Sequence, residues 1–104
     1  MVIIKLQYAP SRPAEGHARS AIVGVVASGN LEVLLERTLP GTECSVEIAT
    51  PVRGYDEVWQ AVVADFVERA SPGGLRISIN DGGARPDTVA LRLMQGVRMM
   101  EAAR

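Results

Sequence analysis

One serine, Ser28, stands out as a residue that another protein could modify. It lies in the segment VGVVASGNLEVLLE, residues 23–36, where apolar runs flank Ser-Gly-Asn. Val and Leu on both sides favour extended chain, and Gly29 and Asn30 tolerate the positive φ of tight hairpin turns. The pattern predicts a serine hydroxyl at the tip of a β-hairpin, facing solvent, where a group can be attached covalently. The same three residue types also form ordinary turns, so the pattern alone leaves a purely structural role open.

Nucleophilic catalysis by Ser28 would need a base, usually a histidine, and a group that orients that base. His17 is the only histidine, and it lies in or just after a proline-rich loop. An extended strand that starts at Ser20 would hold His17 and Ser28 about 25 Å apart, at its opposite ends. We therefore expect His17 to be a solvated loop residue, and we predict no catalytic residue in the chain.

The other reactive side chains indicate structural roles. Cys44 falls on the apolar face of a predicted strand, as a buried small hydrophobe does. No CxxC or HxxxH spacing occurs, so no metal site is predicted. The turn Asp81-Gly82-Gly83 lacks the GxGxxG and GxxxxGK(S/T) patterns of phosphate-binding loops. We expect a plain turn there, with Asp81 and Asp87 in solvated turn or cap positions.

The composition bounds the class of protein. The 104 residues fit a single domain, residues 1–104, and the 47% hydrophobic content includes only four aromatic residues, so the core must be mainly aliphatic. A formal net charge of -1 without a basic stripe argues against a nucleic-acid partner. No apolar run is long enough to span a bilayer, and the first ten residues lack a secretory signal pattern. With one cysteine and no possible internal disulfide, we expect a cytoplasmic protein.

Alternating and apolar runs predict five strands, over residues 2–8, 20–27, 31–38, 43–50 and 75–80. Residues 20–27 are nearly all apolar, which predicts burial on both faces. Gly24 within them indicates a bulge or the close approach of another backbone.

Two helices are predicted, one over residues 56–70 with Asp56 as N-cap and one beginning near Pro86. Their apolar stripes contain Trp59, Val62, Val63, Phe66, Val67 and Ala70 in the first, and Val89, Leu93, Val97 and Met100, widened by Ala90 and Met94, in the second. Arg92 and Arg98 are expected to face solvent. Together these elements predict an α+β two-layer sandwich, a mostly antiparallel sheet of about five strands with two helices packed on one face.

Two segments carry a resemblance to a known family. VGVVASGNLEVLLE resembles the modification site of the acyl carrier (delta) subunit of malonate decarboxylase, which typically reads G-V-V-x-S-G-(D/N)-L-E-V-L-L. ISINDGGARPDTVALRLMQG, residues 77–96, is similar to the strand, loop and helix near the C-terminus of that family. The order and spacing of the two segments and the total length also fit.

The resemblance implies a covalent prosthetic group on Ser28. The group would be 2'-(5''-phosphoribosyl)-3'-dephospho-CoA, attached through a phosphodiester, with Gly29 leaving room beside the attachment point. Its thiol would hold acetyl and malonyl groups as thioesters while malonate is converted to acetate and carbon dioxide. The chain itself would be a non-catalytic carrier, which agrees with the lack of a base near Ser28.

The resemblance also implies a set of partners. They are the acetyl-S-carrier:malonate carrier transferase (alpha) subunit, the decarboxylase beta and gamma subunits, a phosphoribosyl-dephospho-CoA transferase and a malonyl-CoA:carrier transacylase. Candidate docking residues on the predicted surface are Glu32, Glu36, Arg53, Arg85 and Arg92.

Other functions stay open from the sequence. The nearest is the acyl carrier subunit of a citrate lyase-type complex, which resembles this chain less around the serine. An unmodified scaffolding or interaction module is a second, and a serine hydrolase that uses Ser28 is the weakest because no base is near.

Overall fold

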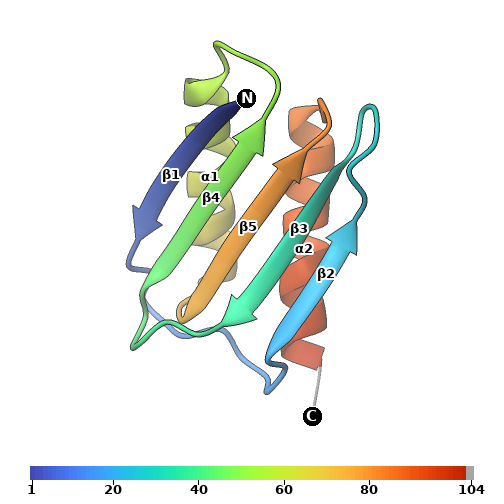
Figure 1. Ribbon diagram of the computed structural model, residues 1–104. Helices are drawn as coiled ribbons and strands as arrows, with labels where there is room; N and C mark the ends of the chain where they lie inside the picture. The colour runs from blue at the N-terminus through green and yellow to red at the C-terminus, as the bar shows by residue number, and fades with distance from the viewer. Residues whose placement is uncertain (103–104) are drawn as a thin grey trace.

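Five strands form one sheet, and two helices cover one of its faces (Figure 1). The computed structural model describes residues 1–102. The elements are β1 (Val2–Tyr8), β2 (Ser20–Gly24), β3 (Leu31–Arg37), β4 (Cys44–Thr50), α1 (Asp56–Ala70), β5 (Leu75–Asp81) and α2 (Pro86–Ala102). The predicted α+β two-layer architecture is confirmed.

The strand order in the sheet is β1-β4-β5-β3-β2. Three neighbouring pairs are antiparallel, and only β4 and β5 are parallel. A parallel pair needs a long crossover, which α1 supplies between these two strands. As a result the β4–α1 loop, the β5–α2 loop and the β2–β3 loop all lie at one end of the sheet (Figure 1).

The core lies between the sheet and the helices. Alternate residues of the central strands point into it, as a period of two requires, and Leu35, Ile48 and Ile77 are each 0% exposed. Gly96 of α2 is also buried, and a Cβ at that position would run into the side chain of Leu35. The glycine thereby lets α2 pack close to β3.

The prediction for residues 20–27 is wrong in length and in burial. β2 ends at Gly24, whose φ of +82° turns the chain out of the ladder, and a Cβ there would run into the carbonyl of Leu31. The close backbone approach predicted at Gly24 is thus confirmed. Because β2 is an edge strand covered on one face only, Ile22 is 59% exposed, and Val25 and Val26 lie exposed in the loop beyond it.

Smaller corrections concern the other elements. The N-cap of α1 is Tyr55 and not Asp56, because the first helical hydrogen bond runs from the Trp59 N–H to the Tyr55 carbonyl. Asp56 is the first helical residue, where its charge still favours the helix dipole. Ala90 is exposed and does not widen the apolar stripe of α2. The strands expected over 31–38, 43–50 and 75–80 shift by one residue at one end.

Neither of the helices described between residues 1 and 102 has the length and apolar character needed to cross a membrane.

Candidate functional site

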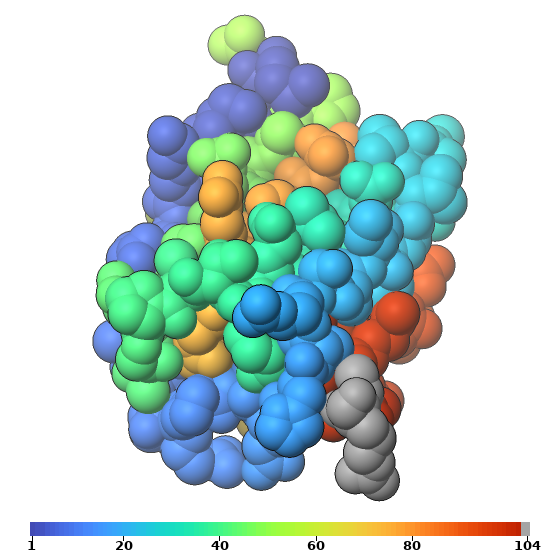
Figure 2. All heavy atoms as spheres, turned by 60° about the horizontal axis from the view of Figure 1, so that its bottom comes forward, coloured from blue at the N-terminus to red at the C-terminus, as the bar shows by residue number. Residues whose placement is uncertain are grey.

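Ser28 lies at the second position of a β-turn that spans residues 27–30. The Asn30 N–H donates to the Ala27 carbonyl at 2.9 Å, and Gly29 has a φ of +75°, as the third position of a type II turn requires. The side chain of Ser28 is exposed. The turn belongs to the Ser28 loop, residues 25–30, which projects from the surface (cyan in Figure 2). The predicted exposed position of Ser28 is confirmed, although the loop is longer than the predicted three residues.

The Ser28 loop is hydrogen-bonded to the β5–α2 loop. The Gly29 N–H donates to the Gly82 carbonyl at 3.1 Å, and the Gly82 N–H donates to the Asn30 carbonyl at 2.8 Å. A Cβ on Gly82 would run into the carbonyl of Ala27. Asp81-Gly82-Gly83 therefore forms a turn, as predicted, and that turn also fixes the backbone on both sides of Ser28.

Asn30 acts differently from the prediction. Among residues 1–102 the only non-glycine residue with positive φ is Ser71, so Asn30 does not take the left-handed conformation. Its side-chain Oδ1 instead accepts a 2.8 Å hydrogen bond from the Leu31 N–H and a 3.3 Å hydrogen bond from Nε of Arg92. The prediction that Arg92 faces solvent is therefore wrong, because this half-buried residue braces the Ser28 loop.

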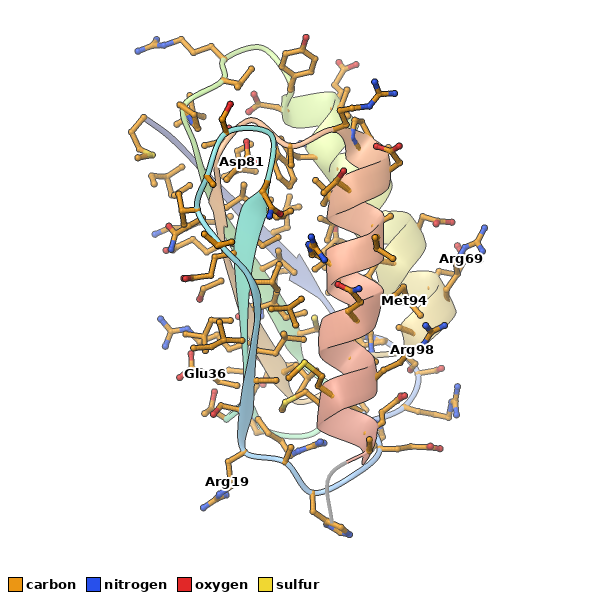
Figure 3. All side chains as sticks on the ribbon, turned by 90° about the vertical axis from the view of Figure 1, so that its right-hand side faces the viewer. Arg19, Glu36, Arg69, Asp81, Met94 and Arg98 are labelled. Atoms are coloured by element: carbon orange, nitrogen blue, oxygen red, sulfur yellow. The ribbon has the colours of Figure 1, made fainter. Side chains whose placement is uncertain are left out.

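Asp81 is buried, and the prediction of a solvated turn residue is wrong. It is 6% exposed and lies at the end of β5, at the same end of the molecule as the Ser28 loop (Figure 3). Its Oδ2 accepts a 2.8 Å hydrogen bond from the hydroxyl of Thr50, and its Oδ1 accepts a 2.9 Å hydrogen bond from the Ala84 N–H. These bonds tie the β5–α2 loop to the end of β4.

His17 and Ser28 lie beyond opposite ends of β2. His17 is exposed, precedes β2, and lies at the end of that strand opposite to the Ser28 loop. No hydrogen bond joins the Ser28 hydroxyl to another residue within the described range 1–102. The expectation that His17 is a solvated loop residue is confirmed.

Cys44 is buried, as predicted, with 0% exposure. Burial raises the pKa of its thiol to about 11. It faces Tyr8 across the β1–β4 pair; burial, and then the charge of a Cys44 thiolate, raise the Tyr8 pKa as well. Cys44 is therefore a core residue and a poor nucleophile.

The described residues, 1–102, contain no group of three His, Cys, Asp or Glu side chains placed to hold a metal ion. Of the candidate docking residues, Arg53 and Arg85 are exposed, whereas Glu32 and Glu36 are half-buried on β3.

A cavity of about 310 Å³, which the sequence analysis did not predict, lies at the same end of the molecule as Ser28. It opens between the β4–α1 loop, the β5–α2 loop and the first turns of both helices. Apolar side chains make most of its wall: Val52, Tyr55, Val58, Trp59, Val62 and Val89. The helical spacing of Trp59 and Val62 predicts that they pack in the core. Because they lie at the end of the core, they also line the cavity.

The surroundings of Ser28 can accommodate a bulky substituent. Nothing lies within 4 Å of a Cβ built on Gly29, so space beside the hydroxyl is open. The backbone below is held by the Gly82 hydrogen bonds, and the hydroxyl itself is exposed. An exposed hydroxyl with open space beside it, on a fixed backbone, is accessible to another protein.

Known proteins resemble this chain over most of its length. Residues 18–100 match the malonate decarboxylase delta subunit family. The malonate decarboxylase acyl carrier protein of Bradyrhizobium diazoefficiens is 69% identical over 85 residues, which cover 82% of this chain and 81% of that protein. The protein of the same name from Xanthomonas euvesicatoria is 44% identical over 103 residues, covering 99% and 98%.

A solved structure is also similar. One chain in the crystal structure of a Pseudomonas malonate decarboxylase hetero-tetramer in complex with malonate matches with a TM-score of 0.84 and 37% identity. The match covers 96% of this chain and 99% of that chain.

Proposed function

The chain belongs to the malonate decarboxylase delta subunit family, and from this we propose that Ser28 is the residue through which it carries acyl groups. The chain is the acyl carrier subunit of a malonate decarboxylase. The finer proposal is that the Ser28 hydroxyl bears 2'-(5''-phosphoribosyl)-3'-dephospho-CoA as a phosphodiester.

The observation that carries this proposal is the way the Ser28 turn is presented. The hydroxyl is exposed, the space beside Gly29 is open, and hydrogen bonds to Gly82 hold the backbone in place. An enzyme that attaches a large group needs access to the hydroxyl, and a carrier needs a fixed point from which a flexible arm can swing. Both needs are met at Ser28.

The attachment needs a base from outside this chain. Forming the phosphodiester creates one bond between Ser28 Oγ and the phosphorus of an activated phosphoanhydride donor, breaks the anhydride P–O bond so that a diphosphate or phosphate group leaves, and removes the serine proton. Because His17 is at the other end of β2, the transferring enzyme must accept that proton. The chain contributes the position of the oxygen and the shape of the turn around it.

The attached group supplies a terminal thiol, on a long arm, that holds acyl groups as thioesters. The chain's own residues then act through geometry. The Ser28 loop, held by Gly82 and Arg92, fixes the base of the arm, so that tethering raises the effective concentration of the acyl group at each partner's active site. No step requires a catalytic side chain on this subunit.

The partners follow from the same proposal. We expect docking to the malonate carrier transferase (alpha) subunit and to the beta and gamma decarboxylase subunits, in line with the hetero-tetramer that contains the similar Pseudomonas chain. Attachment and first loading would require the phosphoribosyl-dephospho-CoA transferase and the malonyl-CoA:carrier transacylase. We place the protein in the cytoplasm, where an unpaired thiol such as Cys44 stays reduced.

Intact-mass analysis of the protein from its native host tests the proposal. The expected result is a mass increase equal to the prosthetic group less one water, localised to a peptide that contains Ser28. Ser28→Ala must abolish the increase, and Ser20→Ala, at another exposed serine, must leave it unchanged. An unmodified wild-type mass in cells that are consuming malonate would overturn the proposal and favour a scaffolding role.

A further inference from the structure

The proposed carrier function does not use the cavity beside Trp59. It has about 310 Å³ of free space and is lined mainly by four valines and two aromatic side chains. Trp59 is only 6% exposed, whereas Tyr55 is 53% exposed, so one ring forms the floor and the other lies at the rim. Small-molecule sites in proteins are typically clefts of roughly 300–1,000 Å³ with mainly hydrophobic and aromatic walls, and this cavity is at the small end of that range.

Few polar groups in the cavity are free. The carboxylate of Asp81 borders it, but its two oxygens already accept hydrogen bonds from Thr50 and Ala84. Arg85 is the other charged residue of the lining, and its side chain is 83% exposed in a 3.5 Å ion pair with Asp87. A surface pair of this kind is weak, so the guanidinium is available to an anion at the mouth.

The cavity is structurally continuous with the attachment point. The β5–α2 loop forms part of its wall through Gly83, Ala84 and Arg85. The residue just before them, Gly82, exchanges hydrogen bonds with Gly29 and Asn30. A group attached to Ser28 and directed along this loop would therefore run toward the mouth of the cavity.

We propose that the cavity binds the adenine ring of the prosthetic group attached to Ser28. This inference rests on the proposed function, since it needs that group on that serine. Of the parts of the arm, only adenine is flat, uncharged at neutral pH and able to stack on aromatic side chains. It is also separated from Ser28 only by phosphate and ribose units, whereas the thiol is at the far end.

The remaining parts of the arm fit the surroundings of the cavity. The diphosphate that follows the adenosine carries negative charge, which Arg85 at the mouth can bind. The pantetheine portion beyond it stays in solvent with the thiol. The bound adenine would shorten the mobile part of the arm and give its swing a defined origin, which raises the effective concentration of the thiol near the protein.

Methyl NMR on the full-length modified protein tests this inference. With the valine methyl groups labelled with ¹³C, nuclear Overhauser effects are expected between the adenine protons H2 and H8 and the methyls of Val52, Val58, Val62 and Val89. The Ser28→Ala protein from the same cells should show none of these effects. The shifts of Val25 and Val26, which are outside the cavity, report any general effect of modification.

A pair of variants on α1 provides the matched control. Val58→Phe fills the cavity and is expected to abolish the adenine contacts, while Ala61→Phe, exposed on the same helix and outside the lining, should preserve them. Protein whose intact mass shows the group on Ser28 but which lacks adenine–valine contacts overturns the adenine site alone. Protein without the added mass overturns the proposed function and this inference together.

Discussion

Arg92, in the middle of α2, donates a 3.3 Å hydrogen bond from Nε to Oδ1 of Asn30, two residues after Ser28. Nη1 of the same guanidinium donates to Oε1 of Gln95 at 2.9 Å, which orients it from its own helix. Together with the Gly82 hydrogen bonds, this contact attaches the Ser28 loop to the C-terminal half of the chain. Asn30 and Arg92 are 62 residues apart in the sequence, so the position of the Ser28 loop depends on a long-range contact.

The Arg92–Asn30 contact predicts opposite effects for two substitutions at Asn30. Asn30→Ala removes the acceptor for both Arg92 and the Leu31 N–H and should lower the free energy of unfolding by about 1 kcal/mol. Asn30→Asp keeps the acceptor and makes the hydrogen bond from Arg92 charge-assisted, so the free energy of unfolding should rise by up to about 1 kcal/mol. Urea unfolding measures both.

The gain from Asn30→Asp should vanish when its partner is removed or screened. In an Arg92→Met background, or in about 1 M salt, Asp should no longer be more stable than Asn. A gain that persists in the Arg92→Met background would show that the side chain acts through the turn alone.

Alanine at Gly82 should speed hydrogen exchange at the Gly29 N–H, whereas alanine at the neighbouring Gly83 should not. Gly82→Ala forces a methyl group into the carbonyl of Ala27, so we expect a loss of about 1–3 kcal/mol, faster hydrogen exchange at the Gly29 N–H and slower modification of Ser28. Gly83→Ala meets open space but adopts a φ of +91°, which costs about 1–2 kcal/mol. In Gly83→Ala the rate of hydrogen exchange at the Gly29 N–H should be unchanged. Equal exchange rates in the two variants would contradict the conclusion that Gly82 holds the Ser28 loop.

The residue pattern within single elements predicted much of the fold. The alternation of Leu31, Val33 and Leu35 predicts their common burial, and the spacing of Val89, Leu93 and Val97 predicts the face of α2. These predictions succeed because each depends on one element's own period. The exposed serine on a turn is likewise a local property, since Gly29 supplies the positive φ.

What local pattern missed depends on contacts between elements. Val25 and Val26 look like strand interior, and only the edge position of β2 exposes them. Asp81 looks like a turn residue, and only the distant hydroxyl of Thr50 makes its burial possible. The position of Arg92 on its own helix predicts a solvent-facing side chain, and only the contact with the Ser28 loop makes it half-buried. The cavity is bounded by loops that the sequence alone does not bring together.

The buried pair of Thr50 and Asp81 should be essential to the end of the sheet that carries the site. Thr50→Val removes the donor to Asp81 Oδ2 and the acceptor of the Val52 N–H, with nearly unchanged shape. Because one oxygen of the buried Asp81 carboxylate then lacks its partner, while the other keeps the Ala84 N–H, the free energy of unfolding should fall by about 2–3 kcal/mol. Thr50→Ser keeps the hydroxyl and should cost about 1 kcal/mol, for a lost methyl group. A Val variant as stable as the Ser variant contradicts the assignment.

Cys44 should be silent in a thiol titration of the native protein, which makes the titration a measure of the arm. Burial moves the pKa of its thiol from 9.0 to about 11, which lowers the reactive thiolate near pH 8 about 100-fold. Unmodified protein should react with a disulfide reagent only after denaturation, whereas modified protein whose acyl thioester has been cleaved should react with one equivalent of the reagent before denaturation. Cys44→Ala should remove only the equivalent that reacts after denaturation.

The same pKa fixes how the stability of the fold changes with pH. A raised thiol pKa means that the folded state favours the protonated form, so this contribution to stability is complete below about pH 9 and is lost as the pH rises toward about 11. The free energy of unfolding should therefore fall over that interval, and less so in Cys44→Ala. An equally steep fall in Cys44→Ala would assign the effect to other groups, with Tyr8, whose raised pKa has the same sign, the first to examine.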